Sequence, residues 1–152
     1  YLKGHGSAVW RVLFTGDGKQ IVSISWDTTI KIWDIVTGTV KLSIKAHSRM
    51  GRGICLTLDE QSIVSCSEDS TIKIWNFSDG KLMATLTGHK SSVNSINFSP
   101  DNKFLISSGE DKTVKIWDFE THQVVHTLTD HTGPVYWSSY SPDGKLIASC
   151  GG

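Results

Sequence analysis

The sequence predicts an all-β protein made of repeated four-stranded antiparallel sheets, each packed face to face on the next. Three observations lead to this prediction: a regular internal repeat, short apolar runs at even spacing between turn residues, and no helical periodicity longer than a turn or two. Several runs are apolar on both faces, and such strands need cover on both sides of their sheet. Sheets stacked around a common axis provide that cover.

The repeat has a period of 42 residues and continues through the chain without an insertion or deletion. Five residue types keep this spacing, which chance does not produce in five columns at once. The columns are His5, His47, His89 and His131; Ser23, Ser65, Ser107 and Ser149; Asp27, Asp69 and Asp111; Thr29, Thr71 and Thr113; and Trp33, Trp75 and Trp117. They divide residues 1–152 into repeats at about 5–46, 47–88 and 89–130 and a partial fourth repeat at about 131–152.

The first repeat contains four predicted strands separated by turn residues. The strands are residues 9–14, 20–25, 29–34 and 40–44. The turns are Gly16-Asp17-Gly18, Trp26-Asp27-Thr28 and Thr37-Gly38. Valine, isoleucine, phenylalanine and tryptophan dominate the runs, as is typical of half-buried or buried strands.

The motif residues resemble those of WD40 repeats over essentially the whole chain. The resemblance is carried by Gly4-His5, Ser23, Asp27 and Ile32-Trp33-Asp34, and again by Gly88-His89 and Ile116-Trp117-Asp118. A Gly-His pair, a turn aspartate and a Trp-Asp pair that recur together every 40 to 45 residues or so are specific to this family. The resemblance implies a β-propeller of four-stranded antiparallel blades around a central channel. About three and a half blades of a seven-bladed ring would be present here.

The second repeat is the least regular of the set. Ala46 precedes its histidine, Gly51 stands where the other repeats have valine, and Asn76 replaces the aspartate of the Trp-Asp pair. Glycine weakens a strand interior and often marks a bulge. We therefore expect the first strand of this repeat, roughly residues 53–58, to be weaker than its counterparts or bulged.

The fourth repeat has His131 and Ser149 but neither an aspartate nor a tryptophan to join them. Leu2 is in register with Ile44, so the chain begins at the tail of a fourth strand. A seven-bladed ring of this period needs about 290 residues, and an unpaired sheet edge invites association. We expect a segment of a longer propeller completed by the same parent chain, with self-association of the segment as the alternative.

The composition argues against several classes of partner. The chain has 15 basic and 15 acidic residues, and it is 38% hydrophobic. A neutral chain lacks the positive field that drives binding to nucleic acid. No apolar run reaches the roughly 18 residues that cross a bilayer, and no targeting segment is recognisable. We expect an intracellular protein, cytoplasmic or nuclear, without nucleic-acid or membrane partners.

The three cysteines, Cys55, Cys66 and Cys150, fit neither an even disulfide set nor the close pairs of a zinc site. We expect all three to be small buried apolar residues. The repeat histidines occur once per sheet, which keeps them apart. No metal site and no cofactor is therefore expected.

The recurring Trp, Ser, His and Asp residues can form a series of hydrogen bonds in every repeat. Tryptophan only donates, an ionised aspartate only accepts, and serine and neutral histidine do both, so the order is Trp to Ser to His to Asp. A satisfied buried network of this kind specifies one packing arrangement. The predicted network residues are His5, Ser23, Asp27 and Trp33; His47, Ser65, Asp69 and Trp75; and His89, Ser107, Asp111 and Trp117.

Serine, histidine and aspartate are also the residues of a hydrolase triad. Catalysis, however, needs one exposed serine beside an oxyanion hole. This sequence has three such sets at a structural period and no G-x-S-x-G motif. A structural role is favoured, and no catalytic residue is expected.

Positions that vary within the regular repeat while facing outward are the candidates for partner binding. They flank the first-strand valine column or precede the turn aspartate. The candidates are Trp10, Trp26, Met50, Arg52, Glu68, Asn94, Glu110 and Tyr136. The resemblance to WD40 propellers implies that these residues ring one mouth of the channel, where peptides dock. Aromatic residues and arginine dominate binding hot spots, and an acidic pair beside aromatic rings suits a lysine or arginine side chain.

Alternatives stay open for these positions and for the function. Trp10 and Tyr136 could instead fill space between blades, and Glu68 and Glu110 could be solvated turn residues. The favoured function is a scaffold that binds other proteins or peptides and is not an enzyme. The alternative is a regulatory propeller attached to an NTPase, kinase or protease domain outside this segment.

Overall fold

The computed structural model describes residues 2–152, and β-strands are the only regular elements in that range. Three four-stranded sheets and one two-stranded sheet account for all of these strands. The first sheet contains β1 (Val9–Phe14), β2 (Gln20–Ser25), β3 (Thr29–Asp34) and β4 (Val40–Lys45). The second contains β5 (Gly51–Leu56), β6 (Ser62–Ser67), β7 (Ile72–Asn76) and β8 (Leu82–Leu86). The third contains β9 (Val93–Phe98), β10 (Phe104–Gly109), β11 (Val114–Asp118) and β12 (Val124–Leu128), and the fourth contains β13 (Val135–Tyr140) and β14 (Ile147–Gly151).

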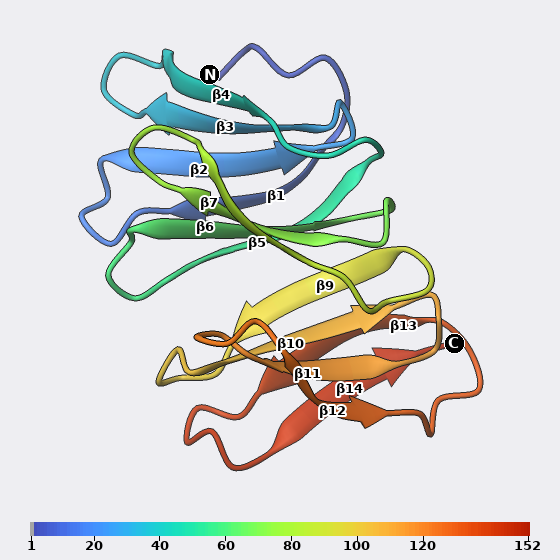
Figure 1. Cartoon of the computed structure of the whole chain (residues 1–152). Coiled ribbons are helices and arrows are strands. Elements are labelled where there is room, and N and C mark those ends of the chain that lie inside the picture. The colour runs from blue at the N-terminus through green and yellow to red at the C-terminus, as the bar shows by residue number, and fades with distance from the viewer. Residues whose placement is uncertain (1) are drawn as a thin grey trace.

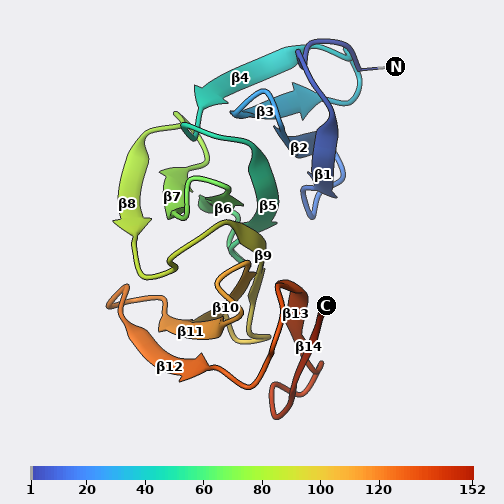
Figure 2. The same cartoon turned by 90° about the vertical axis from the view of Figure 1, so that its right-hand side faces the viewer.

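Within each sheet, strands that follow one another in sequence are neighbours and run antiparallel. The sheets are stacked one after another (Figure 1). The view in Figure 2 shows that they follow an arc, with β1, β5, β9 and β13 on its inner side and β4, β8 and β12 on its outer side. This is the blade arrangement of a partial propeller, and the predicted fold class is confirmed.

The strand register repeats from sheet to sheet. Ser23 pairs with Lys31, and the same pairing recurs one and two periods later. The turn before each third strand contains a residue with a left-handed backbone, at Thr28, Ser70 and Lys112. The four strands predicted in the first repeat are confirmed, with β4 one residue longer than expected. Alternation and turn chemistry were therefore sufficient to place these strands.

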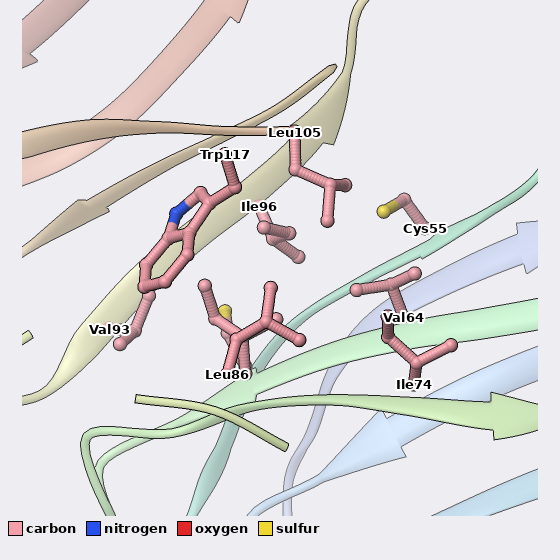
Figure 3. Close-up of a cluster of buried hydrophobic side chains, with 10 residues drawn as sticks. Cys55, Val64, Ile74, Leu86, Val93, Ile96, Leu105 and Trp117 are labelled. Atoms are coloured by element: carbon pink, nitrogen blue, oxygen red, sulfur yellow. The ribbon is translucent and has the colours of Figure 1, made fainter. Parts of the chain in front are cut away.

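The apolar core lies between adjacent sheets. Figure 3 shows the cluster between the second and third sheets, where Val64 and Leu86 face Ile96 and Trp117. A second cluster joins Ile24 and other residues of the first sheet to Trp75 of the second. Each sheet is therefore held mainly by burying apolar area against its neighbours, as in other quasi-linear repeat proteins.

The first strand of the second sheet departs from its prediction. Strand β5 begins at Gly51, two residues before the expected start at residue 53, and pairs with β6 along its length. It contains a bulge between Gly51 and Gly53, but β1 has the same irregularity between Val9 and Arg11. The expected bulge is therefore present, but it is a shared feature of these sheets and does not set this strand apart.

Packing explains the glycine at position 51. A Cβ atom there would lie 2.3 Å from Cγ1 of Ile24 and 3.1 Å from the carbonyl oxygen of Ser25. The Ile24 side chain is fully buried between the first two sheets. The missing side chain therefore provides the space that Ile24 fills.

Replacing Gly51 by alanine should destabilise the protein by about 1–3 kcal/mol, because overpacking a rigid core forces neighbours to shift. Urea denaturation of the two proteins measures this difference. Gly6→Ala is the matched control, because its added Cβ would meet nothing closer than 3.9 Å. Equal stability of the Gly51→Ala and Gly6→Ala proteins would contradict the packing explanation.

Candidate functional site

The predicted network residues of the first sheet lie within hydrogen-bond distance of one another. Trp33 Nε1 is 2.7 Å from Ser23 Oγ. Ser23 Oγ is 2.7 Å from His5 Nε2, and His5 Nδ1 is 2.8 Å from Asp27 Oδ2. The four side chains come from two strands, the turn between them and the segment before β1, so they connect parts of the sheet that are distant in sequence.

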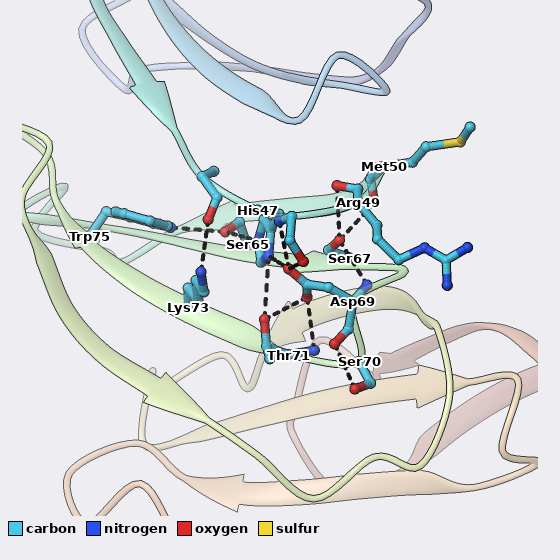
Figure 4. Close-up of polar contacts among 12 residues, drawn as sticks. His47, Arg49, Met50, Ser65, Ser67, Asp69, Ser70, Thr71, Lys73 and Trp75 are labelled. Atoms are coloured by element: carbon cyan, nitrogen blue, oxygen red, sulfur yellow. Dashed lines mark hydrogen bonds and ion pairs between the residues drawn. The ribbon is translucent and has the colours of Figure 1, made fainter.

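The same geometry recurs in the next two sheets. The Trp75–Ser65, Ser65–His47 and His47–Asp69 distances are 2.9, 2.8 and 2.9 Å (Figure 4). The Trp117–Ser107, Ser107–His89 and His89–Asp111 distances are 2.8, 2.8 and 2.9 Å. In the fourth sheet, His131 Nε2 lies 2.8 Å from Ser149 Oγ. The structure therefore brings together every member of the three predicted sets.

The network aspartates accept more hydrogen bonds than the sequence predicted. Asp69 also accepts hydrogen bonds from the Ser48 amide at 3.0 Å and from the Thr71 amide and hydroxyl at 3.1 and 2.6 Å. Burial alone raises the pKa of Asp69, but the donors His47, Thr71 and Ser48 outweigh it and hold this pKa well below its usual range. The threonine column was visible in the sequence, and its role becomes clear from this geometry.

The proton positions follow from these charges. An ionised aspartate can only accept, so the histidine Nδ1–H donates to it and Nε2 accepts from the serine hydroxyl. Burial lowers the pKa of His89, which favours its neutral form despite the neighbouring Asp111. The serine oxygen in turn accepts the indole N–H, which completes the Trp to Ser to His to Asp order.

These serines are poorly placed to act as nucleophiles. Ser23, Ser65 and Ser107 are buried, and each Oγ accepts an indole N–H. A substrate carbonyl needs open access to the hydroxyl and an adjacent oxyanion hole. The residues of a Ser-His-Asp triad are thus arranged as in a hydrolase, but their burial suits a structural role.

The predicted partner-binding residues, which we call the rim, lie at the end of the sheets that the network holds. Trp26 and Glu68 directly precede the network aspartates Asp27 and Asp69. Their amides donate at 3.0 Å to the carbonyls of Ala8 and Met50, which directly precede the inner strands β1 and β5, so each turn is tied to the start of an inner strand. The network therefore fixes the backbone from which the rim side chains project.

Two aromatic residues and one ion pair form the first part of the rim. The rings of Trp10 and Trp26 stack with centroids 5.3 Å apart and planes inclined by 24°. The Arg52 guanidinium carbon lies 5.3 and 5.7 Å from the ring centroids of Trp10 and Trp26. The same guanidinium forms an ion pair with Glu68.

This ion pair corrects one expectation from the sequence. The sequence left two interpretations open for Glu68 and Glu110, an open acidic pair or solvated turn residues, and Glu68 fits neither because it is paired with Arg52. Glu110 remains available on the rim. Trp10 is 50% exposed and Tyr136 is 56% exposed.

A cavity of about 490 Å³ opens beside this group. Its lining comes from all four inner strands and from the β10–β11 turn. The lining residues are Trp10, Arg52, Asn94, Glu110, Tyr136 and Trp137. Five of the eight predicted rim residues thus share one cavity, whereas Trp26 and Glu68 support it through Trp10 and Arg52. Met50 is not part of the lining.

Sequence reasoning missed the residues that line the inner side of the arc below the rim. Arg11 donates to Asn97 Oδ1 at 3.2 Å, and its guanidinium carbon lies 4.4 Å from the ring centroid of Trp137. Arg11 and Trp137 belong to one repeat column, which also holds Gly53 and Ser95. The variation in this column was the available signal.

The cysteines only partly match their prediction. Cys55 and Cys66 are buried, and burial raises the pKa of Cys55 to about 12. Cys150 is exposed, because β14 has only β13 beside it in its sheet. Within residues 2–152, no three His, Cys, Asp or Glu side chains are grouped closely enough to hold a metal ion.

Comparison with known proteins agrees with this architecture. The family model described as "WD domain, G-beta repeat" matches residues 1–34, 38–76, 80–118 and 122–152. The chain belongs to the WD40 repeat family. The suspected resemblance is therefore confirmed by matches that cover most of its length.

Individual relatives are similar over about one repeat. The vegetative incompatibility protein HET-E-1 of Podospora anserina is 55% identical over 38 residues, 25% of this chain and 3% of that protein. The Notchless protein homolog of Arabidopsis thaliana is 46% identical over 44 residues, 29% of this chain and 9% of that protein. The small ribosomal subunit protein RACK1 of Saccharomyces cerevisiae is 44% identical over 36 residues, 24% of this chain and 11% of that protein. The aligned part is thus a small fraction of each relative.

In the part of the chain that the structure describes, no helix has the length and apolar character needed to cross a bilayer.

Replacing Asp69 by alanine should destabilise the WD40 fold by about 1–3 kcal/mol, because the buried His47 N–H loses its acceptor. Thermal unfolding followed by circular dichroism measures the change. Asp130→Ala is the control, since Asp130 is exposed. A melting temperature that is unchanged by the Asp69 substitution would reject the structural role of the network.

Acidification should also destabilise the fold. The pKa values of Asp27, Asp69 and Asp111 are lower in the folded protein than the value of about 3.9 for an unfolded aspartate. Their ionised forms therefore stabilise the fold at pH values above about 3.9, and this stabilisation is lost as the pH falls through the pKa values of the folded state. The pKa of His89 is lowered too, so below about pH 6.5 the unfolded chain binds a proton that the folded protein does not. The histidine and the aspartates therefore both make the fold less stable as the pH falls. Melting temperatures measured from pH 7 to pH 3 should fall, and fall less in Asp69→Asn; a flat profile would contradict this account.

Proposed function

We propose that this chain is part of a protein-interaction scaffold and that its rim docks peptides or segments of partner proteins. The observation that carries the proposal is the cavity to which all four inner strands contribute, with Trp10 and Tyr136 half exposed at its edge. Large aromatic residues beside arginine are the residue types that dominate binding hot spots. A cavity of about 490 Å³ falls in the size range of pockets that take a small ligand or a side chain.

The organisation of the sheet supports the same function. Residues repeated at 42-residue spacing are used inside the network, whereas rim positions differ from sheet to sheet. A rigid scaffold with variable side chains at one end is well suited to recognition, because little order has to be gained on binding. Its partners in this proposal are proteins or peptides, in keeping with the neutral overall charge.

A peptide-display selection against the intact chain tests the proposal. Peptides that bind should lose most of their affinity for a Trp10→Ala, Tyr136→Ala double variant, because the aromatic contact area at the cavity edge is removed. Isothermal titration with synthetic peptides provides the measurement.

Two control variants make the result specific. Val36→Ala with Leu82→Ala removes exposed apolar side chains away from the rim, and Phe14→Ser alters the exposed face of the first sheet. Binding that survives in the rim variant but is lost in either control would place the interaction elsewhere and refute the proposal.

A further inference from the structure

The rim already contains one arginine bound by the protein itself. Arg52 lies over Trp10 and Trp26 and is paired with the carboxylate of Glu68. An aromatic surface and a carboxylate are the two elements that recognise a guanidinium, through cation–π attraction and charge-assisted hydrogen bonds. The first two sheets therefore show which chemical group this kind of rim accepts.

One repeat later, the carboxylate is present without the cation. Glu110 occupies the position of Glu68, and Asn94 occupies the position of Arg52. The Asn94 amide donates to the Val135 carbonyl at 3.0 Å, which holds this side chain in place. In the part of the chain that the structure describes, no basic side chain forms an ion pair with Glu110.

An aromatic ring, that of Tyr136, also lines the cavity together with Glu110. Within residues 2–152 no arginine or lysine covers this ring. The neighbouring Trp137 is covered by Arg11 from below. Tyr136 comes from the sheet after that of Glu110, whereas Trp10 and Trp26 come from the sheet before that of Glu68, so the two sets share residue types and not repeat register. Tyr136 and Glu110 line one cavity, and no guanidinium in residues 2–152 pairs with Glu110.

We infer that this part of the rim takes an arginine side chain from a partner protein, with its guanidinium on the Tyr136 ring and paired with Glu110. The inference rests on the proposed docking function and names the group that the cavity selects. Arginine is favoured over lysine because its planar guanidinium can stack and pair with a carboxylate at the same time. An acidic ligand is disfavoured, because Arg52 is neutralised by Glu68 while the charge of Glu110 is unpaired.

The test uses three blocked pentapeptides, acetyl-Gly-Gly-X-Gly-Gly-amide, in which X is arginine, lysine or citrulline. Citrulline has nearly the shape of arginine but no charge, so it separates charge recognition from shape. Binding to the intact 152-residue chain is followed by NMR titration of the tryptophan indole and backbone amide signals. We expect shifts around Glu110, Tyr136 and Trp137 with the arginine peptide, weaker shifts with lysine, and none with citrulline.

Two isosteric variants locate the site. Glu110→Gln should weaken binding of the arginine peptide roughly 10-fold, the effect of losing a hydrogen bond to a charged group. Glu120→Gln removes another exposed carboxylate, in the β11–β12 turn, and should leave binding unchanged. Equal binding of the arginine and citrulline peptides, or equal loss in both variants, would overturn the inference.

A third variant tests the comparison between repeats. Arg52→Ala should uncover Glu68 and the Trp10–Trp26 pair and create a second arginine site. The Trp26 indole signal should then shift on addition of the arginine peptide, whereas in the natural protein it should stay constant. A Trp26 signal that stays constant in folded Arg52→Ala, checked by its amide spectrum, would count against an arginine-selective rim.

The failure of this inference is distinguishable from failure of the docking function. Display-selected peptides that bind the rim and keep their affinity when arginine is replaced would leave the docking function standing and refute the arginine site. Selected peptides that ignore the rim altogether would refute the docking function.

Discussion

The structure depends on a buried series of hydrogen bonds that is repeated in each complete sheet. Each network links the indole of the third strand to the hydroxyl of the second, then to the histidine before the first strand and the aspartate of the turn. Apolar packing between sheets supplies most of the stabilisation but does not choose among similar arrangements. A polar network that is satisfied in only one arrangement makes that choice.

The network fixes the backbone positions of the rim residues. The residue before each network aspartate belongs to the rim, and its amide donates to the carbonyl of the residue just before the inner strand. The backbone positions of Trp26, Glu68 and Glu110 are therefore nearly the same in each sheet, while their side chains are free to differ. Recognition can change in this architecture without any change in the groups that hold the sheets together.

Much of the fold could be predicted from the sequence because it is local and periodic. Strand alternation, turn residues and the repeated motif placed β1 to β4 to within one residue. The contact between Arg52 and Trp10 could not be predicted in this way. The two residues occupy the same position of adjacent repeats, and the period alone does not show that their side chains meet. The same holds for Arg11, which reaches from β1 to Asn97 of β9 and Trp137 of β13. Long side chains that cross between sheets have no signature in the 42-residue period.

Gly51 shows why an irregular residue is easily misread. In the sequence it breaks a valine column and suggests a weak strand, because glycine has low strand propensity. In the structure its missing side chain makes room for Ile24 of the preceding sheet. The irregular residue, Gly51, lies in the second repeat, whereas the side chain that requires it, Ile24, lies in the first. Repeats in such a fold are therefore best interpreted in pairs, and the pairing of Arg52 and Glu68 with the aromatic residues of the first sheet follows the same rule.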